Sequence, residues 1–342
     1  MKLFLLIFFN LLLLSGASGQ ISGASGQTIN LEKEVPLPAE SNLSLIEHVH
    51  VSASGDVLVT DSSRRNVILF IKETGVFLQL NPDDCHPGYS FQPVRSYFVD
   101  DKVWVMNQQS RIFRFKKDGS CIGADSERFP VPDHFNVTDS NRVAAIKPIG
   151  NDLRNPGLTL YNFSLEEVSN LISFQDRTIA PEMGFRYGGG GLFSHEGTLY
   201  FSLSSAPIIY SYAIKSKNLM TFSPDEAFDM SISSGEDLNG NQKGNPAGIF
   251  SEIRDYTRSY TTTIDFGKLN ETTAVLYVQQ PDRSNRELLF FDLESNTFEP
   301  ESYVIEANSE EHFHAFSNSK AYSITFQDDA NGWVLQVYDI DY

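Results

Sequence analysis

The strongest constraint on the fold is a strand-turn pattern that returns along almost the whole chain. In its first copy, turn segments at Ser62–Arg65 and Lys72–Gly75 separate the apolar runs Val57–Thr60, Asn66–Ile71 and Val76–Leu80. Strands of this length, with turn residues every 8–12 positions, are typical of all-β sandwiches, barrels and propellers. The pattern therefore predicts an all-β protein.

The repetition of this pattern favours a propeller over the other all-β folds. Later copies lie in Lys102–Phe115, Arg142–Phe174, Thr198–Phe222, Ala274–Asp292 and Lys320–Asp339. Of the 342 residues, removal of the first 27 leaves 315, which is about 52 for each of six units. A four-stranded blade takes about 40–50 residues. We therefore predict a six-bladed β-propeller that occupies residues 28–342 as one domain.

The last copy indicates how the ring closes. It has room for three strands, over His312–Phe316, Lys320–Phe326 and Trp333–Ile340. The segment Thr28–Val35 precedes the first copy and has strand-like apolar spacing. We predict that this N-terminal strand completes the last blade as its outer strand, which removes an exposed sheet edge.

Two segments carry a resemblance to known propellers. Ser52–Asp61 (SASGDVLVTD) resembles the strand-turn-strand signature of the NHL and TolB-like six-bladed β-propellers, and Lys102–Met106 followed by Arg111–Phe115 is a looser copy. With its leader and acidic composition, the chain is similar to the exported six-bladed propellers of Bacteroidota. The resemblance implies a propeller over nearly the whole mature chain, and it implies no single activity, because one fold hosts many functions.

The N-terminus has the three parts of a secretory signal peptide. A lysine near the start is followed by an apolar run of about a dozen residues from Leu3 and then by small residues up to Gly19. We predict cleavage of residues 1–19, with an exit after Gly26 as the alternative, because SGASGQ occurs twice. The run is shorter than the roughly 20 apolar residues of a membrane span, and no cysteine stands at the exit. We expect a periplasmic or extracellular protein that is not a lipoprotein.

The charge balance limits the classes of molecule that the protein can bind. Asp and Glu number 44 against 26 Lys and Arg, a net charge of −18. Such an acidic surface repels phosphate backbones, so we expect no nucleic-acid partner. The charge is typical of a secreted protein that stays soluble, and we expect a monomer.

Cys85 and Cys121 are the two cysteines of the chain. An exported protein meets an oxidising compartment, which permits a disulfide. Two free thiols are the equal alternative, because the sequence alone does not place the two Cα atoms within bonding range.

Loop lengths point to a binding face. Short turns connect the first to the second strand and the third to the fourth strand of each copy, and these turns share one face. The other face receives the long segments 81–91, 149–157, 175–187, 223–256 and 281–286. Insertions in repeat folds gather on one face, often the one that binds. We therefore expect the ligand at the long-loop face of the central channel, with the insertion at 223–256 as its largest element.

A set of polar residues falls on the expected innermost strands and is therefore a candidate lining of the channel. These residues are His48, His50, His134, Asn136, His312 and His314. Converging imidazoles can hold a metal, whereas the simpler interpretation is a water-filled channel with polar walls. We name these six as binding candidates and assign no catalytic or metal-ligating residue.

The glycine run before Leu192 has a structural interpretation. A phosphate-binding loop needs Lys and Ser or Thr after its glycines and a helix behind them. Here a strand pattern follows Gly188–Gly191. We predict that these glycines allow a close approach of two backbones.

The chain has no serine-hydrolase or zinc-protease motif, and it lacks the complete set of β-lactamase motifs. We therefore predict a non-enzymatic exported binding module for a protein, peptide or glycan, without a cofactor. The alternative is a metal-dependent hydrolase or lyase, as the lactonase-like and strictosidine-synthase-like six-bladed propellers suggest by analogy. In that case a divalent metal would lie at one mouth of the channel.

Overall fold

The computed structural model of the protein describes most of the predicted propeller. The described residues are 20–22, 28–39, 43–81, 85, 88–125, 129, 132, 134–138, 142–148, 156–173, 189–224, 228, 230–232, 255–306, 309, 312–328 and 332–341. The predicted leader at 1–19 and the second exit at Gly26 lie outside them, as does most of the 223–256 insertion.

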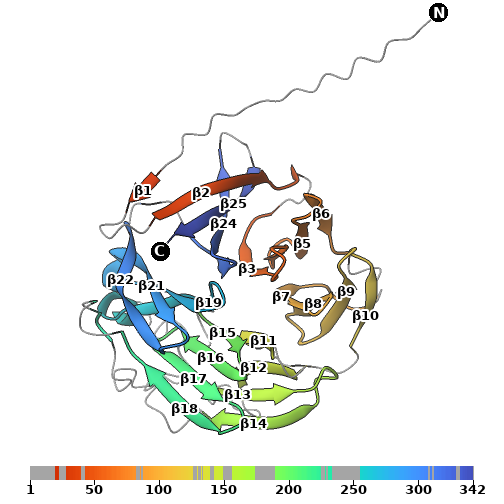
Figure 1. Cartoon of the computed structure of the whole chain (residues 1–342). Helices are drawn as coiled ribbons and strands as arrows, with labels where there is room; N and C mark the ends of the chain where they lie inside the picture. Colours follow the sequence, from red (N-terminus) through yellow and green to blue (C-terminus); the bar gives the residue numbers. More distant parts are fainter. Residues whose placement is uncertain are drawn as a thin grey trace, which may run out of the picture.

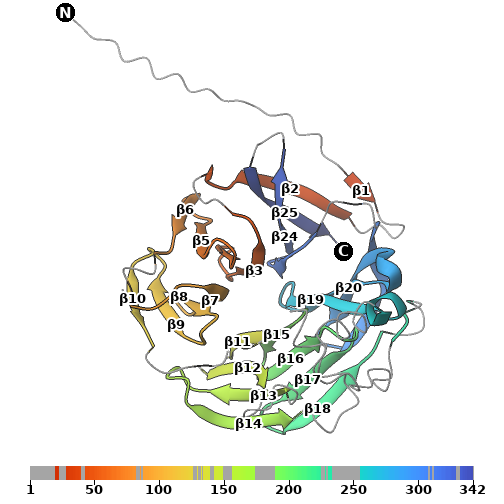
Figure 2. The ribbon, with the colours of Figure 1, turned by 180° about the vertical axis from the view of Figure 1, so that it is seen from behind.

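Six sheets stand around a central axis, as the sequence predicts (Figure 1). Each blade runs from an inner strand at the axis to an outer strand at the rim, and the same ring is seen from behind (Figure 2). Blade 1 contains β3 (Ile46–Val51), β4 (Val57–Asp61), β5 (Asn66–Ile71) and β6 (Val76–Gln79). Blade 2 contains β7 (Pro93–Val99), β8 (Lys102–Asn107), β9 (Ile112–Lys116) and β10 (Cys121–Ala124). Blade 3 contains β11 (His134–Thr138), β12 (Arg142–Pro148), β13 (Pro156–Tyr161) and β14 (Glu167–Ser173). Blade 4 contains β15 (Gly190–His195), β16 (Thr198–Leu203), β17 (Ile209–Ala213) and β18 (Asn218–Phe222). Blade 5 contains β19 (Thr262–Lys268), β20 (Thr273–Gln279), β21 (Asn285–Asp292) and β22 (Thr297–Glu306), with a 3-10 turn η4 (Pro281–Arg283) before β21. Blade 6 contains β23 (Ala315–Ser317), β24 (Lys320–Gln327) and β25 (Gly332–Asp341).

The last sheet joins the two ends of the ring. Strand β2 (Thr28–Pro36) pairs antiparallel with β25, from Thr28 opposite Asp341 to Pro36 opposite Val334. Strand β1 (Gln20–Ser22) adds outside β2, which gives the strand order β1-β2-β25-β24-β23. The N-terminal segment therefore forms the fourth strand of blade 6, in the position expected for Thr28–Val35.

The core consists of six apolar layers, one between each pair of neighbouring blades. Strand β4 shows how one strand serves two layers. Val57 and Val59 pack towards blade 6, whereas Leu58 packs towards blade 2. All three are at most 1% exposed. Because successive side chains of a strand point to opposite faces, a middle strand with a blade on each side is apolar at nearly every position.

The predicted role of the glycines is confirmed at the junction of blades 4 and 5. A Cβ atom at Gly189 would collide with the carbonyl oxygen of Thr263, and one at Gly191 with that of Phe266. Strand β19 therefore approaches the start of blade 4 through space that a side chain would fill.

The two cysteines form a disulfide bond, with Cα atoms 5.1 Å apart. Cys85 lies in the segment between blades 1 and 2, and Cys121 begins β10 at the rim of blade 2. The bond therefore ties the connection between two blades to the outer strand of the second one.

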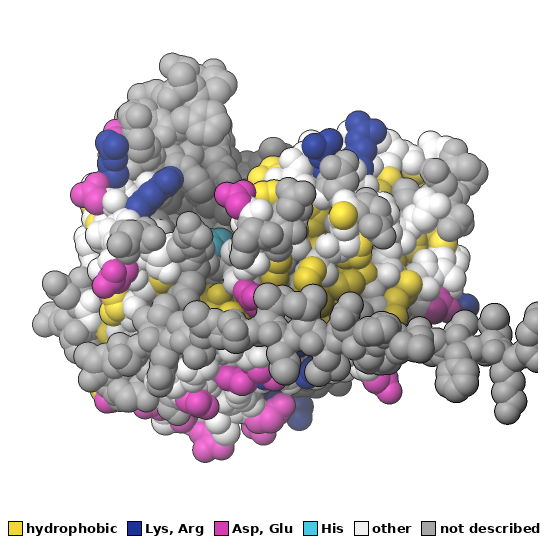
Figure 3. Space-filling view, turned by 90° about the horizontal axis from the view of Figure 1, so that it is seen from above, with side chains coloured by type: hydrophobic (Ala, Val, Ile, Leu, Met, Phe, Trp, Pro, Cys, Tyr) yellow, Lys and Arg dark blue, Asp and Glu magenta, His cyan; other side chains and the backbone are white. Residues whose placement is uncertain are grey.

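The short turns share one face of the disc, in agreement with the alternating direction of the antiparallel strands. Much of the long-loop face lies outside the described residues, including 149–155 and 174–188. Seen edge-on, many of the visible acidic side chains gather towards one face of the disc, at the lower edge of the view (Figure 3).

Candidate functional site

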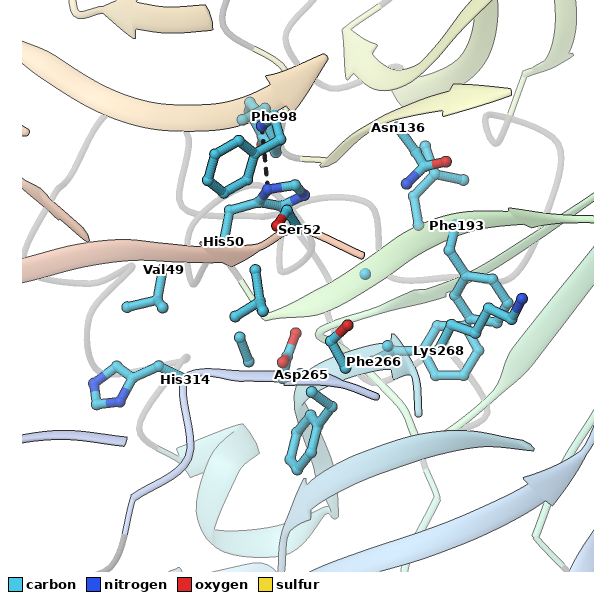
Figure 4. Close-up of a pocket in the computed structure, with 18 of the residues that line it drawn as sticks. Val49, His50, Ser52, Phe98, Asn136, Phe193, Asp265, Phe266, Lys268 and His314 are labelled. Carbon is cyan, nitrogen blue, oxygen red and sulfur yellow. Dashed lines mark hydrogen bonds between the residues drawn. The ribbon is translucent and has the colours of Figure 1, made fainter. Parts of the chain in front are cut away.

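A cavity of about 780 Å³ occupies the axis of the ring (Figure 4). The inner strand of every blade contributes to its wall. Residues of the short turns form one end, including Ser54, Asp100, Lys117, Asn270 and Asn318. The short turns therefore form one end of the cavity. The sequence predicts the ligand at the long-loop face, and because the longest segments of that face lie outside the described residues, this stays a prediction.

All six residues named from the sequence line this cavity. They are His48, His50, His134, Asn136, His312 and His314. The first two lie on β3 and the next two on β11, whereas His312 and His314 directly precede β23. His134, on the inner strand of blade 3, therefore faces the axis.

The histidines of blade 1 bind the backbone of blade 2. His48 Nδ1 accepts a hydrogen bond from the Ser96 N–H at 3.4 Å, and His50 Nδ1 accepts one from the Phe98 N–H at 3.2 Å. These donors belong to β7, an inner strand whose channel edge has no partner strand. An Nδ1 atom that accepts must carry no proton, so both neutral rings have their proton on Nε2.

The other buried histidines also bind backbone groups, one as an acceptor and one as a donor. His314 Nδ1 accepts from the Ile324 N–H at 3.3 Å, which also places the proton on Nε2. His134 Nε2 lies 3.1 Å from the carbonyl oxygen of Gly189 in blade 4, so this ring donates from Nε2. Imidazoles therefore link blade 1 to blade 2 and blade 3 to blade 4 inside the channel.

Burial keeps these rings neutral. It lowers the pKa of His50 to about 4, and the pKa values of His134 and His314 to about 3. The pKa of His48 is also well below its ordinary value, first because of burial and then because of the Arg95 charge. The channel wall is thus built from uncharged imidazoles at neutral pH.

Two charged residues in the same cavity were not found from the sequence. Arg95 on β7 and Asp265 on β19 both line the channel, and both are half-buried. Burial raises the pKa of Asp265 to about 7, against the opposing effects of the Phe266 N–H and the Arg95 charge. Asp265 therefore titrates near neutral pH, which is a property of many functional carboxyl groups.

Arg95 and Asp265 could have been found by assigning the inner strand of all six blades in the sequence, as was done for the strands that carry the histidines. Blades 2 and 5 were recognised from their middle strands, and Pro93–Val99 and Thr262–Lys268 were not assigned. A charged residue in a segment that must form an inner strand is the signal that this alignment would have provided.

The described residues contain no group of three or more His, Cys, Asp or Glu side chains arranged to hold a metal ion. Within the same part of the chain, no helix has the length and apolar character needed to cross a membrane. Both findings concern the residues that the structure describes.

No family model and no curated protein matches this chain. Among solved structures, it is similar to virginiamycin B lyase from Staphylococcus aureus, with 12% identity, 94% of each chain covered and a TM-score of 0.45. It is also similar to U3-55K, with 11% identity, 92% of this chain and 84% of the other covered, and a TM-score of 0.48. A third is YCF48 bound to a D1 peptide, with 11% identity, 94% and 88% covered, and a TM-score of 0.47.

These similarities are too distant to carry an argument about activity. The six sheets of the structure define the class directly: the protein is a six-bladed β-propeller. Its membership of the NHL or TolB-like group stays a prediction from Ser52–Asp61.

Proposed function

We propose that the protein is a binding module whose central channel holds a ligand. The observation that supports this function is the combination of volume and lining. A cavity of about 780 Å³ falls within the range of small-molecule sites, about 300–1,000 Å³. A cavity of this size would admit one end of a peptide or glycan, or a free small molecule.

The wall combines apolar surface with groups that form directed hydrogen bonds. Tyr97 packs against the rings of His48 and His50, with centroid distances of 4.8 and 5.4 Å. Phe98 and Phe193 add aromatic surface to the lining. Mostly rigid walls with a few polar groups are typical of ligand sites, and the inner strands that carry these groups are fixed by two neighbouring blades each.

We also propose that the protein works outside the cytoplasm, as an exported monomer. The leader predicted from the sequence supports this location. The Cys85–Cys121 bond supports it as well, because disulfides persist in oxidising compartments. The mass of the mature protein would show which exit is used, and size-exclusion chromatography would report its oligomeric state.

A pull-down with matched histidine variants tests the binding function. The double variant His50→Ala/His314→Ala changes the channel wall, whereas His195→Ala removes a histidine of β15 that does not line the cavity. We expect captured peptides, glycans or small molecules to be lost from the channel variant and retained by the control. Equal capture by both variants would remove the channel from the proposal.

A hydrolase or lyase is a second candidate, and Asp265 is the observation that favours it. A carboxyl group with a pKa of about 7 in a histidine-lined cavity is suited to acid–base catalysis near neutral pH. Turnover of lactone or ester substrates that Asp265→Asn abolishes would support an enzyme. Metal analysis of the purified protein, with the same assay in chelator, would show whether a divalent metal takes part.

A further inference from the structure

We propose that the channel recognises a carboxylate group of its ligand, with Arg95 as the central contact. This inference rests on the proposed binding function and specifies the chemistry of the ligand. It is carried by the arrangement of hydrogen-bond donors around the axis.

Arg95 is the first part of that arrangement. Its guanidinium makes no hydrogen bond and no ion pair with any residue that the structure describes. Its charge nevertheless acts on groups of three other inner strands, namely His48, His134 and Asp265. A guanidinium has five N–H donors in a planar fork that matches a carboxylate. A half-buried arginine with these donors unused is a ready partner for an oxyanion.

The histidines supply further donors. The backbone N–H groups of Ser96, Phe98 and Ile324 occupy the Nδ1 atoms of His48, His50 and His314. Each of these rings therefore has its proton on Nε2, and for His50 no printed contact of the described residues engages that N–H group. Because the pKa values of these rings lie well below neutral, the rings act as neutral donors and not as cations.

The lysines of the cavity are already neutralised. Lys117 pairs with Asp56 at 3.1 Å, and Lys268 pairs with Glu271 at 2.8 Å. Lys117 directly follows β9 and Lys268 ends β19, so both lie at the short-turn end of the cavity. Arg95 is therefore the cation of the described lining that has no carboxylate partner within ion-pair distance, and a ligand carboxylate would complete it.

Asp265 makes the binding depend on protons. The titratable and charged groups that line the cavity with it are Arg95, His48, His50, His134, His312, His314, Glu47, Asp100, Lys117, Lys268 and Glu271. When it is ionised, Asp265 repels a ligand carboxylate; when it is protonated, it can donate to one. Binding of the ligand anion therefore takes up one proton from solvent when Asp265 begins ionised.

Calorimetric titration with succinate, its neutral analogue succinamide and inorganic sulfate tests the proposal. We expect wild type to bind succinate and not succinamide, with sulfate separating carboxylate recognition from general anion binding. Arg95→Met should weaken succinate binding about 10- to 100-fold, the loss of a charge-assisted hydrogen-bonded contact. Arg142→Met removes an exposed arginine of β12 and should bind as wild type.

Two further measurements keep the test independent of folding. Arg95→Lys retains the charge without the planar fork and should bind succinate at an intermediate strength. Titration in buffers of different ionisation heat should show uptake of up to one proton by wild type near pH 8 and none by Asp265→Asn. Circular dichroism establishes that each variant is folded.

The results separate the two proposals. Unchanged succinate binding by folded Arg95→Met, stronger binding of sulfate than of succinate, or no anion binding by wild type would overturn the carboxylate inference. If a neutral ligand is captured, and is lost from His50→Ala/His314→Ala but retained by Arg95→Met, the channel function stands and its carboxylate specificity does not.

Discussion

Replacement of Asp265 by asparagine is expected to stabilise the folded protein at alkaline pH. The carboxyl group has an ordinary pKa of 3.8 and a pKa of about 7 in the folded protein, because burial penalises its charged form. A raised pKa in the folded state means that the folded protein holds the proton more tightly than the unfolded chain. This tighter proton binding contributes its full stabilisation below pH 3.8, and the stabilisation is lost as the pH rises through 7. Asparagine has nearly the shape of the protonated acid and never pays this penalty.

The magnitude follows from the difference between the two pKa values. About 3 pKa units at about 1.4 kcal/mol each give roughly 4 kcal/mol at pH 8 and above. At pH 5 the same linkage gives about 1.7 kcal/mol, and near pH 3.8 less than about 0.5 kcal/mol. The advantage of the variant should therefore grow over the window from pH 4 to 7 and then level off.

Urea unfolding at five or six pH values between 4 and 8.5 measures this difference directly. Asp328→Asn removes an exposed acid outside the cavity and should leave the pH dependence unchanged. Parallel curves for wild type and Asp265→Asn would show that Asp265 is not held in a disfavoured charged state. A variant that is less stable at pH 8 would show that the charge of Asp265 contributes to folding through Arg95, and the reasoning would be refuted.

Three other perturbations have defined outcomes. Burial lowers the pKa of His134 to about 3, so as the pH falls below 6.5 the unfolded chain takes up this proton before the folded protein does. The folded protein therefore loses about 2 kcal/mol of unfolding free energy between pH 7.5 and pH 5 through this residue. His134→Gln should remove that loss, as measured by urea unfolding at the two pH values. Gly191→Ala should cost about 2 kcal/mol or more in the same assay because its Cβ meets backbone, whereas Gly75→Ala, with nothing nearby and a φ of +66°, should cost about 1 kcal/mol. Equal costs would contradict the close approach of blades 4 and 5. Replacement of both Cys85 and Cys121 by serine should lower the free energy of unfolding by about 4 kcal/mol, because the bond closes a loop between residues 36 positions apart. If reduction leaves the urea midpoint of the wild-type protein unchanged, the result would argue against the bond.

The middle strands made the fold predictable from sequence. Val57–Val59 and Ala274–Val278 are buried on both faces because a blade packs on each side, and such apolar runs stand out against the turns. The N-terminal strand was predictable for another reason, since the last copy lacked one strand and Thr28–Val35 had no other sheet to join.

The site was predictable only in part. The histidines were found because a His-x-His pattern occurs twice, at His48 and His50 and again at His312 and His314. Arg95 and Asp265 occur once each, on inner strands whose water-facing side interrupts the apolar pattern. The shape of the cavity depends on how the inner strands of six blades meet at the axis, which no local pattern encodes. The pairing of the cysteines likewise required three-dimensional proximity.

The pairing of β2 with β25 has a consequence for how the chain acquires its structure. Thr28 and Asp341 are neighbours in the sheet although 313 positions separate them in the sequence. Contacts of such long range form slowly, because the intervening chain must be organised first. If the protein crosses a membrane as an extended chain from its N-terminus, β2 stays unpaired on the far side until β25 has also crossed. Completion of translocation would then be the event that seals the ring, and a pause near residue 330 would leave an open sheet edge exposed to aggregation.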